Sequence, residues 1–346
     1  MRTLRDFNFN KKKVLVRCDF NTPIDEKGNI LDDFRIEQAT PTINFLRQKG
    51  ARVILMSHLD DPPDEIVESL RLNKIQKRLS DLLGLPVKKN DDCIGREVEG
   101  QALVMEEGEI LLLENLRFHR EEKEGDLGFA KELSRLGEIY INEAFSACHR
   151  SHASIIGVPK FLPHGAGFLL EKEIDYLDRL LKEYKKPMVA IVGGKKVETK
   201  AKFINKISEI ADTVLISGLI EKEIKEKKIQ IKNLQKIIAP IDSVGQGLDI
   251  GPKSINLFRE KIIAAETVVW NGPFGKIEDE EFSKGTTEIV KAIIESKVFS
   301  VAGGGETVEF IRKLNLFDKF SHISTGGSAM LSYLAGDKLP GIEALK

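Results

Sequence analysis

The sequence predicts an α/β protein with two doubly wound parallel-sheet domains joined by a connecting helix. Three observations support this fold class: a length of 346 residues, short apolar runs that alternate with helical patterns, and polar or glycine residues that follow several of those runs. Domains usually contain about 100–200 residues, so the length favours two of them. Apolar runs separated by helical patterns are typical of βαβ units, and therefore of parallel sheets.

Eight apolar runs are predicted to be buried strands. Those in the first half are 14–16, 53–56, 110–113 and 139–141, and those in the second half are 188–192, 213–216, 267–270 and 299–302. In open α/β sheets, ligands bind beyond the carboxyl ends of the strands. Each half is therefore expected to be a Rossmann-like domain that binds a ligand at that edge.

The segment 169–184 is predicted to be the connecting helix, because its apolar residues recur at helical spacing and Pro187 ends the pattern. We therefore expect an N-terminal domain over 1–168, the helix and its exit over 169–186, a C-terminal domain over 187–330, and a tail over 331–346. The Lys- and Glu-rich stretch 221–236 is expected to be a solvated helix or loop.

Charge and cysteine content exclude several classes of protein. Lys and Arg (53) nearly cancel Asp and Glu (54), so no global basic field attracts nucleic acid or a membrane surface. The three cysteines are widely spaced without a CxxC pair, which indicates neither a disulfide framework nor a cysteine-based zinc site. No signal peptide or membrane-spanning run is evident. We expect a cytoplasmic protein.

Glycine clusters follow apolar runs in the second half, at 193–194, 303–305 and 326–327. Glycine lets the backbone approach a phosphate, and the N-terminus of a following helix favours an anion. One such cluster would more often be a structural turn, but three favour phosphate binding. Lys196 and Lys200 would share one helical face beside the first cluster and suit a polyphosphate. The alternative, two solvated lysines, stays open on these residues alone.

The first half instead carries arginines and histidines near its strand ends. They are Arg17, Arg35, Arg117, Arg120 and Arg150, with His58, His119, His149 and His152. The planar guanidinium binds carboxylate and phosphate in a bidentate manner, so a small anion with both groups is the expected guest. A metal cluster at Cys148, His149 and His152 is disfavoured, because no further ligands at zinc spacing accompany it. The residues thus indicate a kinase with a nucleotide half and an anionic-substrate half.

Long motifs in a fixed order then identify a resemblance to the phosphoglycerate kinase family over nearly the whole chain. They are RCDFNTP (17–23), DDFRIEQATPTI (32–43), LLLENLRFHREEKEGD (111–126), EIYINEAFSACHRSHAS (138–154), IVGGKKVETK (191–200), GLDIGPKS (247–254), TVVWNGPFGKIE (267–278), GGGETV (303–308) and HISTGGSA (322–329). The resemblance implies reversible phosphoryl transfer between 1,3-bisphosphoglycerate and ADP, giving 3-phosphoglycerate and ATP. It also implies Mg²⁺ with the nucleotide, a monomer, and a C-terminal tail that returns to the first domain.

Site residues follow from the resemblance by position. Arg35 and Lys196 would be catalytic and meet the transferring phosphoryl group from opposite sides. The substrate-binding residues would be Asp19, Phe20, Asn21, Arg35, His58, Asp61, Arg117 and Arg150. The nucleotide-binding residues would be Lys196, Lys200, Gly247, Gly272, Phe274, Ile277, Glu278 at the ribose, Gly304, Gly305, and Glu306 and Thr307 at the Mg-phosphate end, with Glu306 meeting the metal through the nucleotide.

Four departures from the family pattern bear on activity. Asp61 stands where an arginine is expected, Glu306 replaces an aspartate, and Lys195 interrupts a glycine-alanine step. The segment 216–247 is much shorter than its family counterpart. Asp61 and the short segment leave open a non-catalytic or altered-substrate paralogue. Retention of Arg35, Lys196 and Lys200 favours an active kinase.

Overall fold

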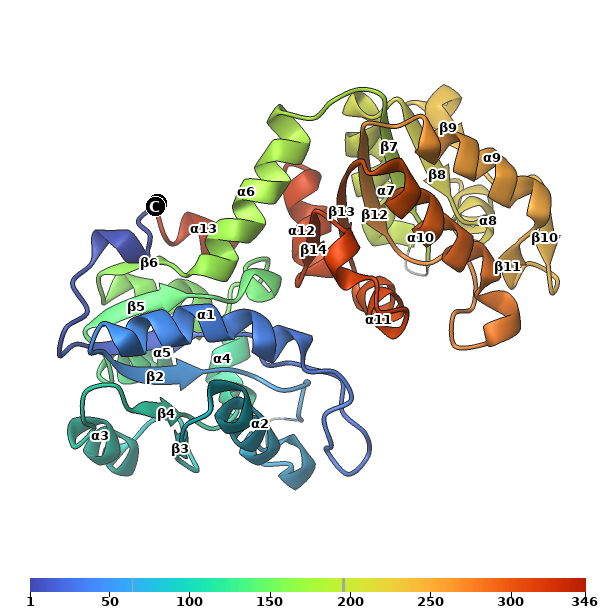
Figure 1. Cartoon of the computed structure of the whole chain (residues 1–346). Helices are drawn as coiled ribbons and strands as arrows, with labels where there is room; N and C mark the ends of the chain where they lie inside the picture. Colours follow the sequence, from blue (N-terminus) through green and yellow to red (C-terminus); the bar gives the residue numbers. More distant parts are fainter. Residues whose placement is uncertain (64, 195–196) are drawn as a thin grey trace. The chain divides into compact units, whose positions relative to one another are not determined.

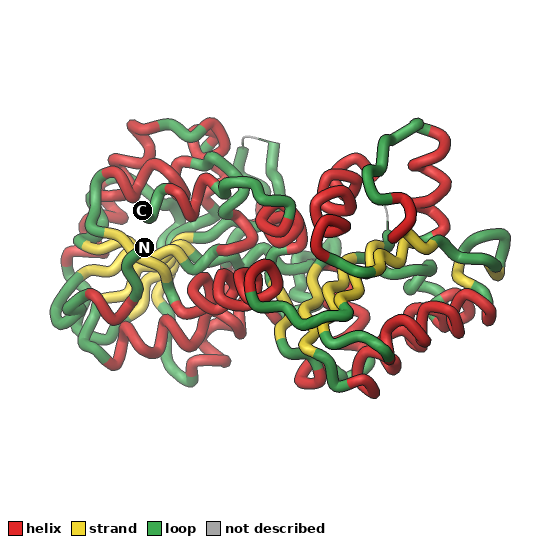
Figure 2. Tube along the Cα trace, turned by 90° about the horizontal axis from the view of Figure 1, so that it is seen from above, coloured by secondary structure: helices red, strands yellow, loops and turns green. Residues whose placement is uncertain are grey.

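The computed structural model describes residues 1–63, 65–194 and 197–346. The chain divides into two compact units (Figure 1). The first unit comprises Met1–Glu173 and Lys338–Lys346, and the second comprises Ile174–Asp337. In each unit, strands run through the middle with helices on both sides (Figure 2).

The first unit contains a six-stranded sheet in the order β3-β4-β2-β1-β5-β6, with every neighbouring pair parallel. Because β2 and β5 flank β1 on opposite sides, the strand order reverses between β1 and β5, which makes this the switch point of the sheet. The strands are β1 Lys13–Arg17, β2 Arg52–Met56, β3 Lys88–Lys89, β4 Ile110–Leu112, β5 Ile139–Asn142 and β6 His164–Ala166. The helices are α1 Phe34–Gln48, α2 Asn73–Leu83, α3 Arg96–Leu103, α4 Arg120–Glu124, α5 Leu127–Ser134 and α13 Pro340–Glu343.

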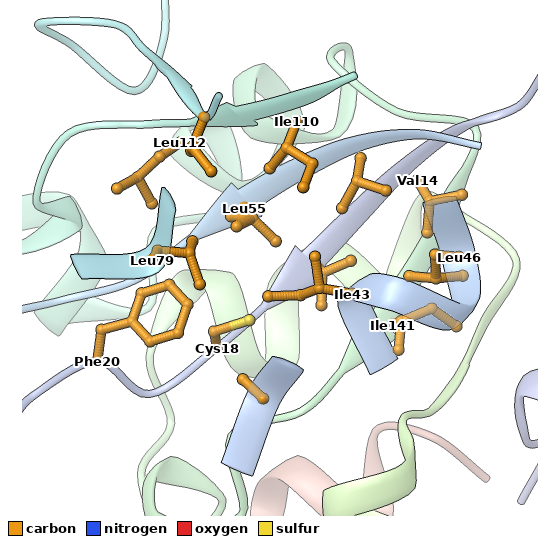
Figure 3. Packing of buried hydrophobic residues seen from close by; sticks show 14 of the residues in the cluster. Val14, Cys18, Phe20, Ile43, Leu46, Leu55, Leu79, Ile110, Leu112 and Ile141 are labelled. Carbon is orange, nitrogen blue, oxygen red and sulfur yellow. The ribbon is translucent and has the colours of Figure 1, made fainter. Parts of the chain in front are cut away.

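The core of the first unit lies between the sheet and helices α1 and α2 (Figure 3). Alternate side chains of the strands, including Val14, Leu55 and Ile141, pack against Ile43 of α1 and other apolar residues. These side chains are almost completely buried, and burying one aliphatic side chain stabilises a fold by about 1.5–3 kcal/mol. The core therefore fixes the strands whose ends carry the polar residues.

The second unit repeats this architecture in the order β14-β13-β12-β7-β8-β9, again with parallel neighbours. Its switch point lies between β7 and β12. The strands are β7 Met188–Val192, β8 Thr213–Ile216, β9 Ile237–Ile238, β12 Thr267–Asn271, β13 Phe299–Gly303 and β14 His322–Ser324, and β10 Ser243–Val244 pairs with β11 Asp249–Ile250 in a small antiparallel ladder. The helices are α7 Val197–Ile210, α8 Gly218–Glu226, α9 Pro252–Ile263, α10 Lys284–Ser296, α11 Gly305–Lys313 and α12 Gly327–Leu334.

The predicted fold class, with two parallel-sheet α/β domains, is confirmed. Each of the eight predicted strands is present with ends that differ by at most one residue. The expected connecting helix is α6, Phe168–Lys182, and the division between the two units falls inside it. The segment 221–236 forms most of α8 and a following loop, as expected. The short strands β3, β6, β9 and β14 were not predicted.

A buried carboxyl group holds the start of α6. Glu143 follows β5, is fully buried, and accepts a hydrogen bond from the Leu169 amide at 3.0 Å. Burial raises the pKa of Glu143 to about 8. The carboxyl group is therefore largely protonated at neutral pH, which explains how the first unit accommodates it without a cation.

In the part of the chain that the structure describes, no helix combines the length and the apolar character needed to cross a membrane.

Candidate functional site

At the switch point of the first sheet, Asp19 holds the guanidinium of Arg35. Asp19 follows β1, and Arg35 lies in the first turn of α1. Arg35 Nη1 donates to Asp19 Oδ2 at 3.0 Å and to the Asn21 carbonyl oxygen at 2.7 Å. Ser146, from the loop after β5, donates its hydroxyl hydrogen to Asp19 Oδ2. Groups from two adjacent strand ends thus fix Arg35, while its side chain stays 27% exposed and can meet a ligand.

The charges around Asp19 set its protonation state. Burial alone would raise the pKa of Asp19, but the charge of Arg35 and the Ser146 hydrogen bond together hold it well below its usual range. Burial also lowers the pKa of His58 well below its ordinary value, despite the nearby Asp19. His58 is therefore neutral. Its Nδ1 lies 3.3 Å from Arg17 Nη2, which can only donate, so the His58 proton resides on Nε2.

The arginines predicted from the sequence separate into two groups. Arg17 is fully buried, donates to Ser154 Oγ at 2.6 Å and lies 3.5 Å from Glu122, so it has a structural role. Arg120 pairs with Glu124 on the surface. Arg117 is buried and donates to the Asp60 carbonyl oxygen, but its Nε lacks a hydrogen-bond partner among the described residues.

Positive charge accumulates around Arg117. Burial, and then the charges of Arg150 and Arg17, lower its pKa. Burial, and then the charges of Arg17, Arg117 and Arg150, also lower the pKa of His152 to about 3. An anion would relieve this repulsion, and a phosphate or carboxylate would also satisfy the unpaired guanidinium nitrogen. This group of side chains in the first unit is therefore a candidate anion site.

Asp61, a negatively charged residue of the predicted set, lies next to Arg117. Its carboxylate lies 3.9 Å from Arg117 Nη1 and 3.4 Å from Lys123 Nζ, with 66% of the side chain exposed. It thus lies beside the anion site and partly neutralises it. Phe20 is fully buried in the core, so its side chain is not accessible to a substrate.

The alternative metal cluster around Cys148 finds no support among the described residues. The Cys148 thiol is buried and donates to the Ala144 carbonyl oxygen at 3.4 Å, and it shares no compact group of ligand atoms with His149 and His152.

At the switch point of the second sheet, the backbone itself forms the site. A Cβ atom on Gly193 would lie 2.1 Å from the Pro273 carbonyl oxygen, and one on Gly272 would lie 2.1 Å from the Gly193 carbonyl oxygen. Gly272 also has a φ of +93°, which favours glycine. Thr307 Oγ1 accepts a hydrogen bond from the Gly272 amide at 2.8 Å. The ends of β7 and β12 and the start of α11 therefore meet closely.

Lys200 of α7 is the described lysine at this point. It is buried, and its ammonium group donates to the Gly193 carbonyl oxygen. Glu306 lies nearby, since a Cβ on Gly194 would approach both Lys200 Nζ (3.1 Å) and Glu306 Oε2 (3.4 Å). The amides at the N-terminus of α11, which begins at Gly305 after Gly304, add partial positive charge. Lys196 lies outside the described residues.

A cavity of about 300 Å³ opens beside these groups. Gly247, Phe274, Ile277, Glu278 and Glu306, all predicted nucleotide residues, line it. Lys200, Gly272, Gly304, Gly305 and Thr307 do not line it but lie at the strand ends described above. The cavity thus has an apolar wall and a polar end, a combination that fits a nucleotide.

The sequence reasoning missed Ser217, Leu219, Leu248, Pro273 and Lys276, which also line the cavity. Ser217 caps α8 by accepting a hydrogen bond from the Ile220 amide, directly after β8. Because Ser217 follows a buried strand, its position in the sequence indicated that it lies at the ligand-binding edge of the sheet. Leu219 and Leu248 carried no such signal, because apolar residues in loops and first helical turns are common.

Comparisons with known proteins agree with this architecture. The family model described as "Phosphoglycerate kinase" matches residues 4–233 and 219–337. Curated proteins named phosphoglycerate kinase from Dictyoglomus turgidum and Moorella thermoacetica are each 41% identical to the chain, over 388 and 387 aligned positions that cover 99% of this chain and 98% of each protein. These alignments exceed the 346 residues of the chain, so it is shorter than these relatives at internal positions.

Solved structures give the same result. The crystal structure of phosphoglycerate kinase from Pyrococcus horikoshii OT3 matches with a TM-score of 0.90 and 33% identity, covering 100% of this chain and 98% of that one. The structure of phosphoglycerate kinase from Coxiella burnetii matches with a TM-score of 0.82 and 29% identity over 99% of this chain and 98% of that one. Sequence and structure agree over the full length: the chain belongs to the phosphoglycerate kinase family.

Proposed function

We propose that the protein catalyses reversible phosphoryl transfer between 1,3-bisphosphoglycerate and ADP, giving 3-phosphoglycerate and ATP. The observation that carries the proposal is the chemistry of the two switch points. The first holds Arg35, whose guanidinium is partly exposed, and buried Arg117, whose Nε lacks a hydrogen-bond partner among the described residues. The second combines glycine backbone, a helix N-terminus and Lys200. Phosphoryl transfer depends mainly on positioning and charge stabilisation, which such groups supply.

The residues of the first unit would bind the phosphoglycerate. Arg117 and Arg150 supply positive charge, and neutral His58 presents its Nε2 proton as a hydrogen-bond donor. Asn21 is tied into the same loop, since its Oδ1 accepts from the Asp60 amide at 2.8 Å. Asp19 orients Arg35, which would stabilise the charge on the transferring phosphoryl oxygens.

The residues of the second unit would bind the nucleotide. Lys200 would contact its phosphates, Glu278 its ribose, and Phe274 and Ile277 its base. Lys196, which lies outside the described residues, would act on the transferring phosphoryl group, as the family resemblance implies. The Thr307 hydroxyl accepts from Gly272 and keeps its own hydrogen for a phosphate oxygen.

The donor set of this pocket fits a magnesium ion bound with the nucleotide. Mg²⁺ is usually held by one or two carboxylates together with substrate phosphates. Glu306 lines the cavity and supplies one carboxylate. When bound, the ion would neutralise charge on the phosphates, and Glu306 would meet it through the nucleotide.

A coupled assay tests the proposal directly. Purified protein should form ATP from 1,3-bisphosphoglycerate and ADP with Mg²⁺, and the rate should vanish on chelation of the metal. A folded protein that binds both substrates without forming ATP would instead be the non-catalytic paralogue. The full-length match to relatives named as kinases gives that alternative no support.

We further propose a cytoplasmic monomer that binds neither nucleic acid nor membrane. The near balance of 53 basic and 54 acidic residues supports this, because it leaves no overall positive charge to attract nucleic acid or an anionic membrane. Light scattering after size-exclusion chromatography should give the mass of one chain, 38.8 kDa.

A further inference from the structure

A group of three potential metal ligands lies in the first unit outside the residues assigned to substrate. Asp92 and Cys93 follow β3, and His119 immediately precedes α4. A carboxylate oxygen of Asp92, the Cys93 sulfur and a ring nitrogen of His119 all lie within 4.8 Å of one another. Two ligand atoms of one divalent ion, each about 2.0–2.3 Å from the metal, are at most about 4.6 Å apart, so small side-chain shifts would let all three atoms bind one ion.

Local hydrogen bonds hold these atoms in place. Asp92 Oδ1 accepts from the Cys93 amide at 2.6 Å and lies 2.7 Å from His119 Nε2. The Asp92 amide donates to Asn90 Oδ1 at 3.0 Å, which fixes the loop. The ring of His119 packs on Phe129, with centroids 5.1 Å apart. The three side chains are therefore held together by contacts among themselves and by Asn90 and Phe129, which are not proposed ligands.

The ligand types favour a borderline transition metal. Thiolate, imidazole and carboxylate together are typical of Zn²⁺ and Co²⁺ rather than Mg²⁺. Cys93 is fully buried, whereas the side chains of Asp92 and His119 are 54% and 26% exposed, so a path from solvent remains. A cation bound here would displace the thiol proton of Cys93, since only the thiolate is a good metal ligand.

We propose that Asp92, Cys93 and His119 form a three-ligand site for Zn²⁺ or a similar divalent ion, with water in the remaining position. This site is distinct from the Mg-nucleotide pocket, which lies in the other unit. The spacing of the cysteines could not indicate it, because His119 lies far along the chain from Cys93 and no CxxC pair is involved. A competing explanation is that the Asp92–His119 contact only ties the loop to α4.

Cobalt spectroscopy on the full-length, reduced, metal-free protein separates these explanations. Without nucleotide, one equivalent of Co²⁺ should produce a near-ultraviolet thiolate-to-cobalt band, and Zn²⁺ should remove it. Cys93→Ser should abolish the band. The matched control is Cys148→Ser, which removes another buried free thiol and should leave the band intact.

Zn²⁺ affinity, measured by competition with a chelating dye, provides a second readout that does not depend on enzyme activity. His119→Gln and Asp92→Asn should each weaken Zn²⁺ binding at least tenfold, in the range found for altered metal sites. Both side chains are partly exposed, so these variants test the site even where Cys93→Ser does not fold. A cobalt band that survives in Cys93→Ser, or Zn²⁺ affinities equal to the parent in both partner variants, would overturn the proposal.

Discussion

In both units the candidate site lies at the carboxyl ends of parallel strands, but the two sites consist of different chemical groups. In the first unit, long charged side chains form the site and other side chains lock them, as Asp19 locks Arg35. In the second, glycine backbone forms the site, and Gly193 and Gly272 leave no room for a side chain. Fixed guanidinium groups select the shape and charge of a small acid, whereas backbone and a helix N-terminus accept any phosphate chain. Selectivity for the acid should therefore reside in the first unit.

The largest expected effect follows from removing Arg35. Arg35→Ala should lower kcat about a thousandfold while changing substrate affinity much less, because an arginine of this type acts on charge in the transition state. Steady-state kinetics would show this. Arg120→Ala, which removes a surface arginine, is the control and should retain the parent kcat. An unchanged kcat in Arg35→Ala would remove Arg35 from catalysis.

The second prediction concerns Glu143, the buried carboxyl group of the first unit. Because burial raises the folded-state pKa of Glu143 to about 8, from an ordinary value of 4.5, its protonated form stabilises the fold below about pH 4.5. That contribution is lost as the pH rises through about 8. Glu143→Gln mimics the protonated acid, so its stability advantage should grow between these limits, to the order of 5 kcal/mol at most.

Hydrogen exchange of the β5 amides, followed from pH 5 to pH 8, measures this effect in the first unit. Trp270, the single tryptophan, lies in β12 and serves as the control, since its fluorescence reports the second unit and should show no such difference. Parallel pH profiles for parent and variant would mean that Glu143 is ionised in the folded protein.

The third prediction concerns Lys200, the buried lysine at the strand ends beside the nucleotide cavity. Lys200→Ala removes a charge-assisted contact worth about 1.5–3 kcal/mol, so the nucleotide KM should rise about 10- to 100-fold with a smaller change in kcat. Lys202→Ala is the matched control, because Lys202 lies on the same helix but is exposed and paired with Asp337. A nucleotide KM equal to that of the parent would mean that backbone alone binds the phosphates.

The fourth prediction reverses the sign of one charge in the first unit. Asp61 lies 3.9 Å from Arg117 and would repel a bound phosphate by roughly 1 kcal/mol in water. The parent should bind 3-phosphoglycerate weakly but measurably by calorimetry, and Asp61→Arg should improve the affinity several-fold. Asp61→Asn should fall between the two. Equal affinities in all three proteins would show that Asp61 does not face the substrate.

The smallest expected effect concerns base selectivity in the second unit. The cavity wall includes Leu219 and Leu248, which are 39% and 43% exposed, so the shortened 216–247 segment encloses the base incompletely. ATP and GTP should therefore differ in affinity by less than a fully enclosing pocket allows, within about tenfold. Calorimetry would measure the affinity for each nucleotide. Strong selectivity for ATP would mean that the pocket encloses the base more fully than we expect.

The sequence predicts the central strands well because each is buried on both faces and therefore appears as a continuous apolar run, as in Met188–Val192. Edge strands such as β3, which consists only of Lys88 and Lys89, depend on pairing with a neighbouring strand and leave no apolar run in the sequence. The candidate site residues follow from the family resemblance. Their partners do not, because Asp61 meets Lys123 only after the chain has folded.

The C-terminal segment limits when the first unit can complete its fold during synthesis. Lys338–Lys346 belongs to that unit although the whole second unit precedes it in the chain. Gly341 donates its amide to the Cys148 carbonyl oxygen at 2.9 Å, and a Cβ there would lie 2.8 Å from Ile155. During synthesis, the ribosome therefore delivers every residue of the second unit before it releases the piece that completes the first. The first unit can therefore be completed only after every residue of the second unit has been translated.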